Sequence, residues 1–457
     1  MTVVPQSLSC ILGGKIQKNQ PNDKNQGCNV VFGKLLAGEK QCTSIHMLSS
    51  SALSDFKKLI SARFLFTLAV QMQAVVVGWR IYELTNDPLS LGLVGLAEAI
   101  PALSLALYAG YVVDRSRPIK VYRWVLEGSL LASGILLTAS LFGDQWSTGM
   151  HIFALYLSSV CSGAARAFSQ PSMYAILPKM TKRDGLSKAL AWMSTAMQVA
   201  RVSGPALGGL IFGFMGMKVS FGVIFVLLLG ALAATYGIKM KIEAPALDGE
   251  PRAMVEELKS GVKFVFGHPI LLPALTLDMI SVLFGGVTAL LPIYAKEILE
   301  IGPRGLGILR AAPAVGAMVM GFILTRFAIR KNAGRYLLSA VFGFGLSILV
   351  FAVSKDFYLS IFALIFSGVF DSVSVVIRST AVQLASPDHM RGRISSVNSM
   401  FIGSSNEVGE FESGVAAKFL GTVPAACFGA VMCLLTVGIV SWKFPALRRM
   451  DMDKVAP

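Results

Sequence analysis

The chain has few charged residues for its length, and it lacks the residue alternation of a β-barrel. Only 15% of its 457 residues are charged, whereas 54% are hydrophobic. So few charges do not suffice to cover a soluble globular protein of this size. Apolar and polar residues do not alternate with a period of two, which argues against an outer-membrane barrel. The apolar surface is therefore expected to face lipid.

Cysteine and histidine are also scarce, and neither forms a recognisable site. The six cysteines and four histidines lack the spacing of a metal site or of a disulfide framework. The GGK at 13–15 lacks the spacing of a phosphate-binding loop. No combination of Ser, His and Asp indicates a catalytic triad. We therefore expect no enzymatic activity, no metal and no cofactor.

The net charge of +15 is explained by membrane orientation rather than by nucleic acid. Lysine and arginine gather in loops on one side of the predicted membrane, such as 115–123 and 326–335, while opposite loops hold few, such as Lys218 and Lys355. This asymmetry follows the positive-inside rule and predicts that both termini are cytoplasmic. A nucleic-acid partner is not expected.

Apolar segments of about 20 residues recur about twelve times, and each is long enough to cross a hydrocarbon layer of ~30 Å. The sequence predicts an all-α membrane protein with twelve transmembrane helices. The predicted spans are 62–84, 88–112, 121–142, 150–170, 187–214, 219–239, 269–294, 304–327, 335–354, 357–381, 394–417 and 423–444.

Two loop patterns repeat at one offset and divide the chain into two halves. GYVVDRSRPIKVYR (110–123) is echoed by GFILTRFAIRKNAGR (321–335), and LPKMTKRDGLSKAL (177–190) by SPDHMRGRISSVNS (386–399), each about 210 residues later. The pattern predicts two homologous six-helix bundles, and transporters built this way hold their substrate near the midplane between the repeats.

The domain prediction follows from these spans. A polar N-terminal stretch without an apolar signal region is expected to be disordered and cytoplasmic, unless translation begins near Met47. The linker carries Val255, Leu258, Val262 and Phe266 at helical spacing, which predicts an amphipathic helix. The predicted parts are a tail at 1–55, bundles at 56–239 and 269–446, the linker at 240–268 and a C-terminal tail at 447–457.

The loop after the second span contains a motif for helix contact. Gly110 and Asp114 are four residues apart and share a helix face. Gly110 allows a neighbouring backbone to approach, and Asp114 is placed to accept hydrogen bonds from the amides at a helix N-terminus. With the basic Arg115, these residues are interpreted as a latch between the cytoplasmic ends of the bundles. The alternative is a basic loop that only sets orientation.

These residues resemble the loop motif of the major facilitator superfamily, and the predicted layout of six plus six spans matches that fold. Two longer stretches, GWRIYELTNDPLSLGLVGLAEAIPAL (78–103) and VQLASPDHMRGRISSVNSMFIGSSNEVGEFESG (382–414), resemble the enterobactin-exporter and small-molecule efflux branch of this superfamily. The resemblance implies export of small molecules such as siderophores or drugs across the bacterial inner membrane, driven by the proton gradient.

The fifth span resembles the antiporter-associated motif of the superfamily at Gly204, Pro205 and Gly208, with Ala191 and Ala200 in place of two glycines. Pro205 is expected to bend the span, and the bend would seal the periplasmic end. Small-residue packing without any role in coupling is the alternative.

Charged residues far from the span ends are candidates for proton coupling, because intramembrane charge is costly unless it is paired or hydrated. We rank Glu410, Glu407, Asp278 and Glu98 in that order, and Arg201 is expected to pair with one of the acids of the eleventh span. The alternative is a fixed network of ion pairs. A structural or snorkelling role is expected for the charged residues nearer the span ends, which can reach interfacial water: Arg80, Glu127, Arg310 and Arg378.

An apolar and aromatic cavity with a few polar contacts is expected between the bundles. Its candidate lining residues are Gln71, Gln73, Trp79, Phe284, Asn398, Phe401 and Asn406.

The sequence is therefore interpreted as a monomeric, proton-coupled antiporter that exports a small molecule by alternating access and contacts membrane lipids. Import or uniport of a metabolite uses the same residues and stays open. A membrane sensor with the same fold is the remaining alternative, and it would tolerate loss of the intramembrane acids.

Overall fold

The computed structural model describes residues 50–181, 183–240, 254–327, 329–387 and 390–454, which belong to one compact unit. The predicted disordered tail thus lies outside the described residues, except that a helix already begins at Ser50. Within some helices the side chains are not described, and these include Asp114, Phe401 and Glu407. All regular structure among the described residues is helical.

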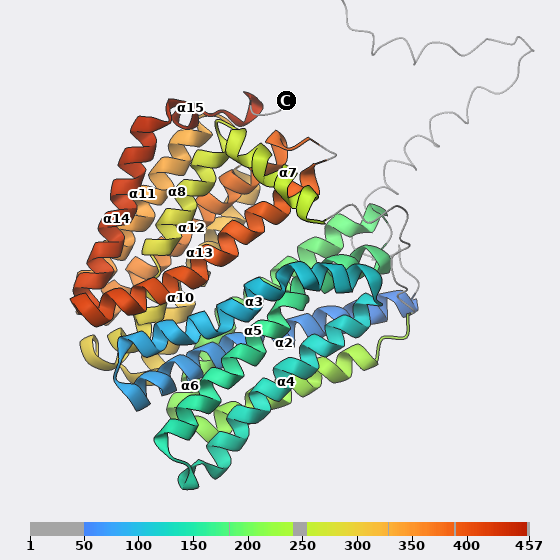
Figure 1. Cartoon of the computed structure of the whole chain (residues 1–457), viewed down its shortest axis with the longest axis vertical. Coiled ribbons are helices and arrows are strands. Elements are labelled where there is room, and N and C mark those ends of the chain that lie inside the picture. The colour runs from blue at the N-terminus through green and yellow to red at the C-terminus, as the bar shows by residue number, and fades with distance from the viewer. Residues whose placement is uncertain (1–49, 182, 241–253, 328, 388–389, 455–457) are drawn as a thin grey trace, which may run out of the picture. The chain divides into compact units, whose positions relative to one another are not determined.

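Two sets of long helices form the two halves of the chain (Figure 1). In the first half these are α2 (Ser50–Thr85), α3 (Pro88–Arg115), α4 (Pro118–Phe142), α5 (Thr148–Met180) and α6 (Arg183–Tyr236), with the short η3 (Gly143–Gln145). In the second half they are α8 (Leu271–Phe284), η4 (Val287–Leu290), α9 (Leu291–Ile293), η5 (Tyr294–Ile298), α10 (Gly302–Arg326), α11 (Ala333–Val353), α12 (Phe357–Ala385), α13 (Arg391–Leu420), α14 (Thr422–Lys443), α15 (Pro445–Arg448) and η6 (Met452–Lys454).

Among the described residues, 10 helices are long and apolar enough to cross a membrane. One of them, α6, contains two predicted spans, because Gly216 has φ 80° and ψ −176° and interrupts the helix between residues 215 and 217. Glycine tolerates this conformation without steric cost. The predicted eleventh span is the helix α13, which is too polar to count among the ten. All predicted spans are thus found as helices, consistent with a twelve-helix fold.

Large apolar side chains are exposed along these helices, as expected for lipid contact. Examples are Phe322, Phe366 and Trp442, which are 67%, 52% and 85% exposed. The start of α3 follows from the local sequence. Asp87 accepts a hydrogen bond from the backbone N–H of Leu89 at 3.1 Å, and Pro88 occupies the first turn of the helix.

The predicted seventh span, 269–294, is not one continuous helix. Helix α8 ends at Phe284, and Gly285 and Gly286 separate it from the short elements η4, α9 and η5. A methyl group on Gly286 would lie 3.1 Å from the carbonyl carbon of Gly409, so α13 crosses the chain closely at this break. Discontinuous transmembrane helices of this kind line substrate and ion sites in transporters.

Helix α7 (Met254–Gly267) falls in the stretch where the sequence predicts an amphipathic linker helix. Its Val265 is fully buried against the second half, whereas Phe266 is 56% exposed. The side chains of Val255 and Leu258 lie outside the described residues.

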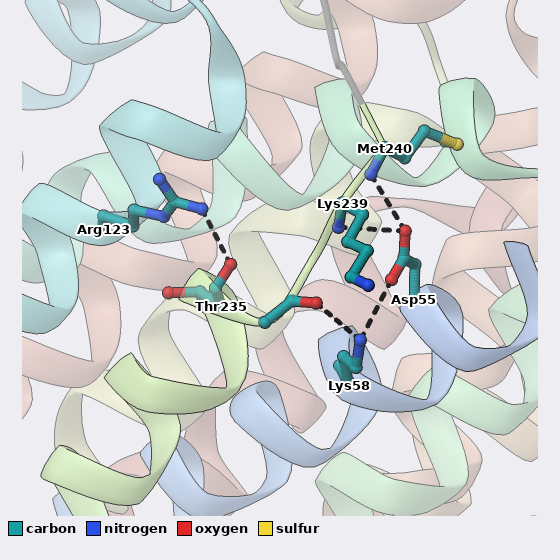
Figure 2. A network of polar contacts seen from close by, with 7 residues as sticks. Asp55, Lys58, Arg123, Thr235, Lys239 and Met240 are labelled. Carbon is teal, nitrogen blue, oxygen red and sulfur yellow. Dashed lines mark hydrogen bonds and ion pairs between the residues drawn. The ribbon is translucent and has the colours of Figure 1, made fainter. Parts of the chain in front are cut away.

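The start of the linker is fixed to the first half by polar contacts (Figure 2). Asp55 accepts hydrogen bonds from the backbone N–H groups of Lys239 and Met240 at 3.1 and 2.9 Å, and Lys58 donates to the carbonyl oxygen of Gly237 at 2.5 Å. Because a lysine at a helix C-terminus satisfies orphan carbonyl groups, this network ends α6 and holds the chain where it enters the linker.

At the start of α8, His268 supports the first helical turn. Its Nδ1 accepts hydrogen bonds from the backbone N–H groups of Ile270 and Leu271, both at 3.2 Å. A protonated ring cannot accept them. Burial lowers the pKa of His268 below its ordinary value. The stabilisation is therefore present above the ordinary histidine pKa of about 6.5 and is lost as the pH falls through the lower pKa of the folded state.

We predict that acidification destabilises the protein in part through His268. His268→Ala should lower the free energy of unfolding by about 1 kcal/mol at neutral pH. His268→Asn should keep the cap and remove its contribution to the pH dependence. Thermal unfolding in detergent at neutral and mildly acidic pH measures both effects. Equal pH dependence of wild type and His268→Asn would contradict the assignment.

Candidate functional site

The two halves approach most closely where glycines face one another. A methyl group on Gly209 of α6 would lie 2.6 Å from the Cα of Gly307 of α10. One on Gly414 of α13 would lie 2.9 Å from the Cα of Gly92 of α3. Only glycine permits such close crossings of two backbones. The contact between α3 and α13 can be followed in Figure 1. Both crossings lie towards the helix ends that the sequence predicts to be periplasmic.

Polar contacts join the two halves at the same end. The pairs are Lys418 with Asp87 (3.1 Å), Lys296 with Asn86 (2.6 Å), Arg304 with the carbonyl oxygen of Gly213 (3.0 Å from Nη2) and Tyr82 with Glu297. These contacts lie between this end and the middle of the helices, as does the hydrogen bond from Arg310 to the carbonyl oxygen of Ala74. We call this region the closed end.

Next to the closed end, charged side chains from both halves come together. Glu98 of α3 forms an ion pair with Arg166 of α5 at 3.4 Å, and both side chains are partly exposed. Glu410 of α13 lies against α3, because a methyl group on Gly95 would lie 2.9 Å from its Oε2. The charges of Arg310, Glu98 and Arg166 all act on Glu410. We call the four side chains Glu98, Arg166, Arg310 and Glu410 the charge cluster.

Arg310 links the charge cluster to the other half of the protein. Its Nη1 donates a hydrogen bond to the carbonyl oxygen of Ala74 of α2 at 3.0 Å. Of the two roles expected for Arg310, structural or snorkelling, this contact corresponds to the structural one, since the side chain is directed at the first half. Two acids and two arginines balance in charge here, so adding or removing one proton leaves one charge uncompensated between the two halves.

Asp278 lies elsewhere, inside the second half. It forms an ion pair with Arg378 of α12, and the two side chains are only 9% and 2% exposed. Arg378 is 1% exposed, so of the two roles expected for it, structural or snorkelling, the geometry corresponds to the structural one. For Asp278 the geometry corresponds to the alternative of a fixed ion pair.

Arg201 is not brought to Glu410. It is exposed, and the charge that acts on it is that of Arg63. On α6 it lies three residues before Gly204 and seven before Gly208, on the face that packs against α2 further along the helix. The expected ion pair with an acid of the eleventh span is not found among the described side chains, and the Glu407 side chain lies outside them.

The span-five motif residues make close helix contacts. A methyl group on Gly204 would lie 2.6 Å from the Cβ of Gln71, and one on Gly208 would lie 2.9 Å from the Cα of Met72. The carbonyl oxygen of Pro205 lies at the crossing with Gly307. The motif thus packs α6 against α2 and α10. The break at Gly216 falls between the predicted fifth and sixth spans, so the bend at Pro205 stays a prediction.

At the opposite end of α3, the predicted latch is described only in part. Arg115 is exposed and stacks on Tyr111, with its guanidinium carbon 4.1 Å from the ring centroid. Gly110 is half-buried in α3. The Asp114 side chain lies outside the described residues, so the latch stays a prediction.

The residues predicted to line the cavity lie in both halves and make separate contacts. Gln73 donates to the Ser162 hydroxyl oxygen at 3.1 Å within the first half, and Trp79 is 9% exposed in its core. Phe284 packs edge to face on Phe428, with ring centroids 6.0 Å apart. The others are Gln71 beside Gly204, half-buried Asn398 with an unpartnered Oδ1, exposed Asn406, and Phe401, whose side chain is not described.

Sequence reasoning missed two arginines of the first half. Arg166 lies within the predicted span 150–170, and Arg63 is 4% exposed and donates hydrogen bonds to Ser169 and Gln170. A simple census of charged residues inside apolar stretches would have found both. No group of three or more His, Cys, Asp and Glu residues with the geometry of a metal site occurs among the described residues.

Comparison with known proteins gives one family match. Residues 48–457 match the model of the transmembrane secretion effector family. Among curated proteins, the enterobactin exporter EntS of Shigella dysenteriae serotype 1 is 23% identical over 348 residues, covering 74% of this chain and 80% of the relative. EntS of Shigella boydii serotype 4 is 24% identical over 350 residues, with the same coverage.

Solved structures of transporters share the fold. A POT family transporter in complex with 5-aminolevulinic acid superposes with a TM-score of 0.70 at 10% identity, over 86% of this chain and 96% of the other. A bacterial homologue of the iron transporter ferroportin in an inward-facing state gives a TM-score of 0.62 at 15% identity, over 87% and 99%.

Proposed function

Because the chain belongs to the transmembrane secretion effector family of major facilitator transporters, we propose that it exports a small molecule across the bacterial inner membrane in exchange for protons. Its cargo is proposed to be a siderophore or a similar compound, because its EntS relatives are named as enterobactin exporters. The proton gradient supplies the energy, without a bound cofactor.

The observation that carries this proposal is the charge cluster beside the closed end. Glu98 and Arg166 come from the first half, and Arg310 and Glu410 from the second. Moving the halves apart at the closed end would separate Glu410 from Gly95 and bring water to its carboxyl group. Proton binding at Glu410 and the relative position of the halves therefore depend on each other. This dependence is what proton coupling requires.

The positive-inside rule gives the proposed orientation of the protein in the membrane. Basic loops predict that the ends of α3 and α10 near Arg115 and Arg326 are cytoplasmic. The closed end is then periplasmic, and Arg201 and Asn406, both exposed, are accessible from the cytoplasm in this state. In the proposed cycle, cargo binds from the cytoplasm, the halves rock, and protons enter as cargo leaves.

This orientation predicts one-sided labelling. In a variant whose six native cysteines are replaced by serine, Asn406→Cys should react with a membrane-impermeant maleimide in inside-out vesicles and about 10-fold more slowly or not at all in right-side-out vesicles. Thr148→Cys, at the exposed start of α5, is the matched control and should show the reverse. Equal labelling of Asn406→Cys from both sides would contradict the proposed state.

Transport in liposomes tests the function itself. Purified protein should move enterobactin or another siderophore against its gradient when the pH difference is imposed, and Glu410→Gln should not. Glu127→Gln is the control, because Glu127 is exposed and contacts only Tyr236 among the described residues. Transport insensitive to the pH gradient would favour uniport, and accumulation in the opposite direction would favour import. Absence of any flux, with normal cargo binding, would favour a sensor.

A further inference from the structure

A second polar site lies inside the second half, away from the charge cluster. A small pocket is lined by Asp278 and Ser281 of α8, Asp371 and Ser374 of α12, and the apolar Val341 and Phe344 of α11. On α12, Asp371, Ser374 and Arg378 follow at intervals of three and four residues and share one helix face. Asp278 and Ser281 share a face of α8 in the same way.

Polar groups in this pocket are left without partners. Ser374 is 3% exposed, and its hydroxyl oxygen has no hydrogen-bond partner. Asp371 makes no hydrogen bond or ion pair with the described residues. Buried polar groups without partners are costly, and native proteins rarely keep them unless something else binds there.

The charges do not balance. Asp278 is paired with Arg378, so the two acids and one arginine sum to one negative charge when all are ionised. A further titratable group near the pocket is the Cys433 thiol of α14, which contacts Ser281 and donates to the carbonyl oxygen of Val341 at 3.7 Å. No charged group of the neighbouring described helices acts on Asp371. Asp371 is half-buried, and an uncompensated carboxylate on a membrane-spanning helix is costly unless a single positive charge joins it.

The geometry points to a site for one monovalent cation, held by carboxylate oxygens of Asp371 and Asp278 and by the hydroxyl oxygens of Ser374 and Ser281. Two carboxylates, one already paired with arginine, provide too little charge for a typical divalent metal site. The Ser281 hydroxyl donates to the carbonyl oxygen of Leu277 at 2.6 Å, which leaves its lone pairs free to face a cation. The proposed cation is Na⁺. A proton bound to Asp371 and donated to the Ser374 hydroxyl oxygen would neutralise the same charge without the other ligands, and the test distinguishes the two.

This site is independent of the proposed transport function. It lies within one half, so it does not have to open when the halves rock. A cation there would hold α8 to α12 and fix the broken helix that continues through Gly285 and Gly286 beside Glu410. Binding is therefore expected to change stability whether or not cargo is transported.

Thermal unfolding of the full chain in detergent tests the site. NaCl is titrated against N-methyl-D-glucamine chloride at constant ionic strength, and a parallel series varies the pH without Na⁺. If the cation is Na⁺, the melting temperature should rise by roughly 3 °C at about 100 times the dissociation constant. If it is a proton, the melting temperature should fall as the pH rises, with no response to Na⁺. Either response should disappear in Asp371→Asn and weaken in Ser374→Ala.

Ser367→Ala is the matched control, because Ser367 is also 3% exposed on α12 but donates to the carbonyl oxygen of Leu364 at 2.7 Å. It should keep the wild-type response. Should Asp371→Asn be too unstable to purify, ²²Na⁺ binding to wild type and Ser374→Ala provides the Na⁺ test, and the pH series on Ser374→Ala the proton test. Cation and pH responses that are the same in wild type, Asp371→Asn and Ser374→Ala would overturn the site and leave the transport proposal untouched.

Discussion

Replacing Glu410 with glutamine is expected to remove the dependence of transport on the pH gradient while leaving the fold intact. Glutamine keeps the size of the side chain beside Gly95 but carries no exchangeable proton. Coupling between two sites typically amounts to about 1–3 kcal/mol, so the gradient-driven part of transport should fall by roughly 5- to 150-fold. Cargo counterflow without a pH gradient should continue, because it requires only movement of the halves.

The measurement is siderophore flux in liposomes with and without an imposed pH difference. Glu98→Gln provides a graded comparison, since its pair with Arg166 is partly exposed and contributes less. An unchanged response to the gradient in Glu410→Gln would remove this residue from the coupling mechanism. Loss of both gradient-driven flux and counterflow would indicate a structural role instead.

The second large effect is expected from the buried ion pair of Asp278 and Arg378. Asp278→Asn should lower the free energy of unfolding by about 3–5 kcal/mol, because it leaves the arginine charge buried without a partner. The double variant Asp278→Leu/Arg378→Met should recover most of this loss, since it removes both charges together. Thermal unfolding in detergent measures the difference.

The control for this prediction is an ion pair at the surface of a helix. Arg80 and Glu83 on α2 lie 2.7 Å apart, and their side chains are 24% and 43% exposed. Glu83→Gln should cost no more than about 0.5 kcal/mol. Equal losses in Asp278→Asn and in the double variant would show that packing, rather than the isolated charge, sets the stability of this region.

The positions of the spans could be predicted because each follows from local composition. An apolar run between charged loops is sufficient to place a membrane helix, as for α4 and α11. The interruption of the seventh span was not predicted. Two adjacent glycines can lie within a continuous helix. The break depends on how closely α13 crosses the chain at Gly409.

The partners of the intramembrane charges could not be predicted from the sequence. Asp278 and Arg378 are 100 positions apart in the chain, and only the packing of α8 against α12 brings them together. The distance of Arg310 from a span end likewise did not indicate its partner, which is a backbone carbonyl group of the other half. Glu98 and Glu410 were recognised as candidates because their positions in the spans allowed no other route to water.

The most direct test of the account is to lock the closed end. In a variant without native cysteines, Asp87→Cys and Lys418→Cys replace an ion pair that joins the two halves at 3.1 Å, and a short reducible reagent that reacts with both thiols connects them. The account predicts that cargo flux stops when the cross-link forms and returns when it is reduced. Undiminished flux in fully cross-linked protein would contradict alternating access through this end.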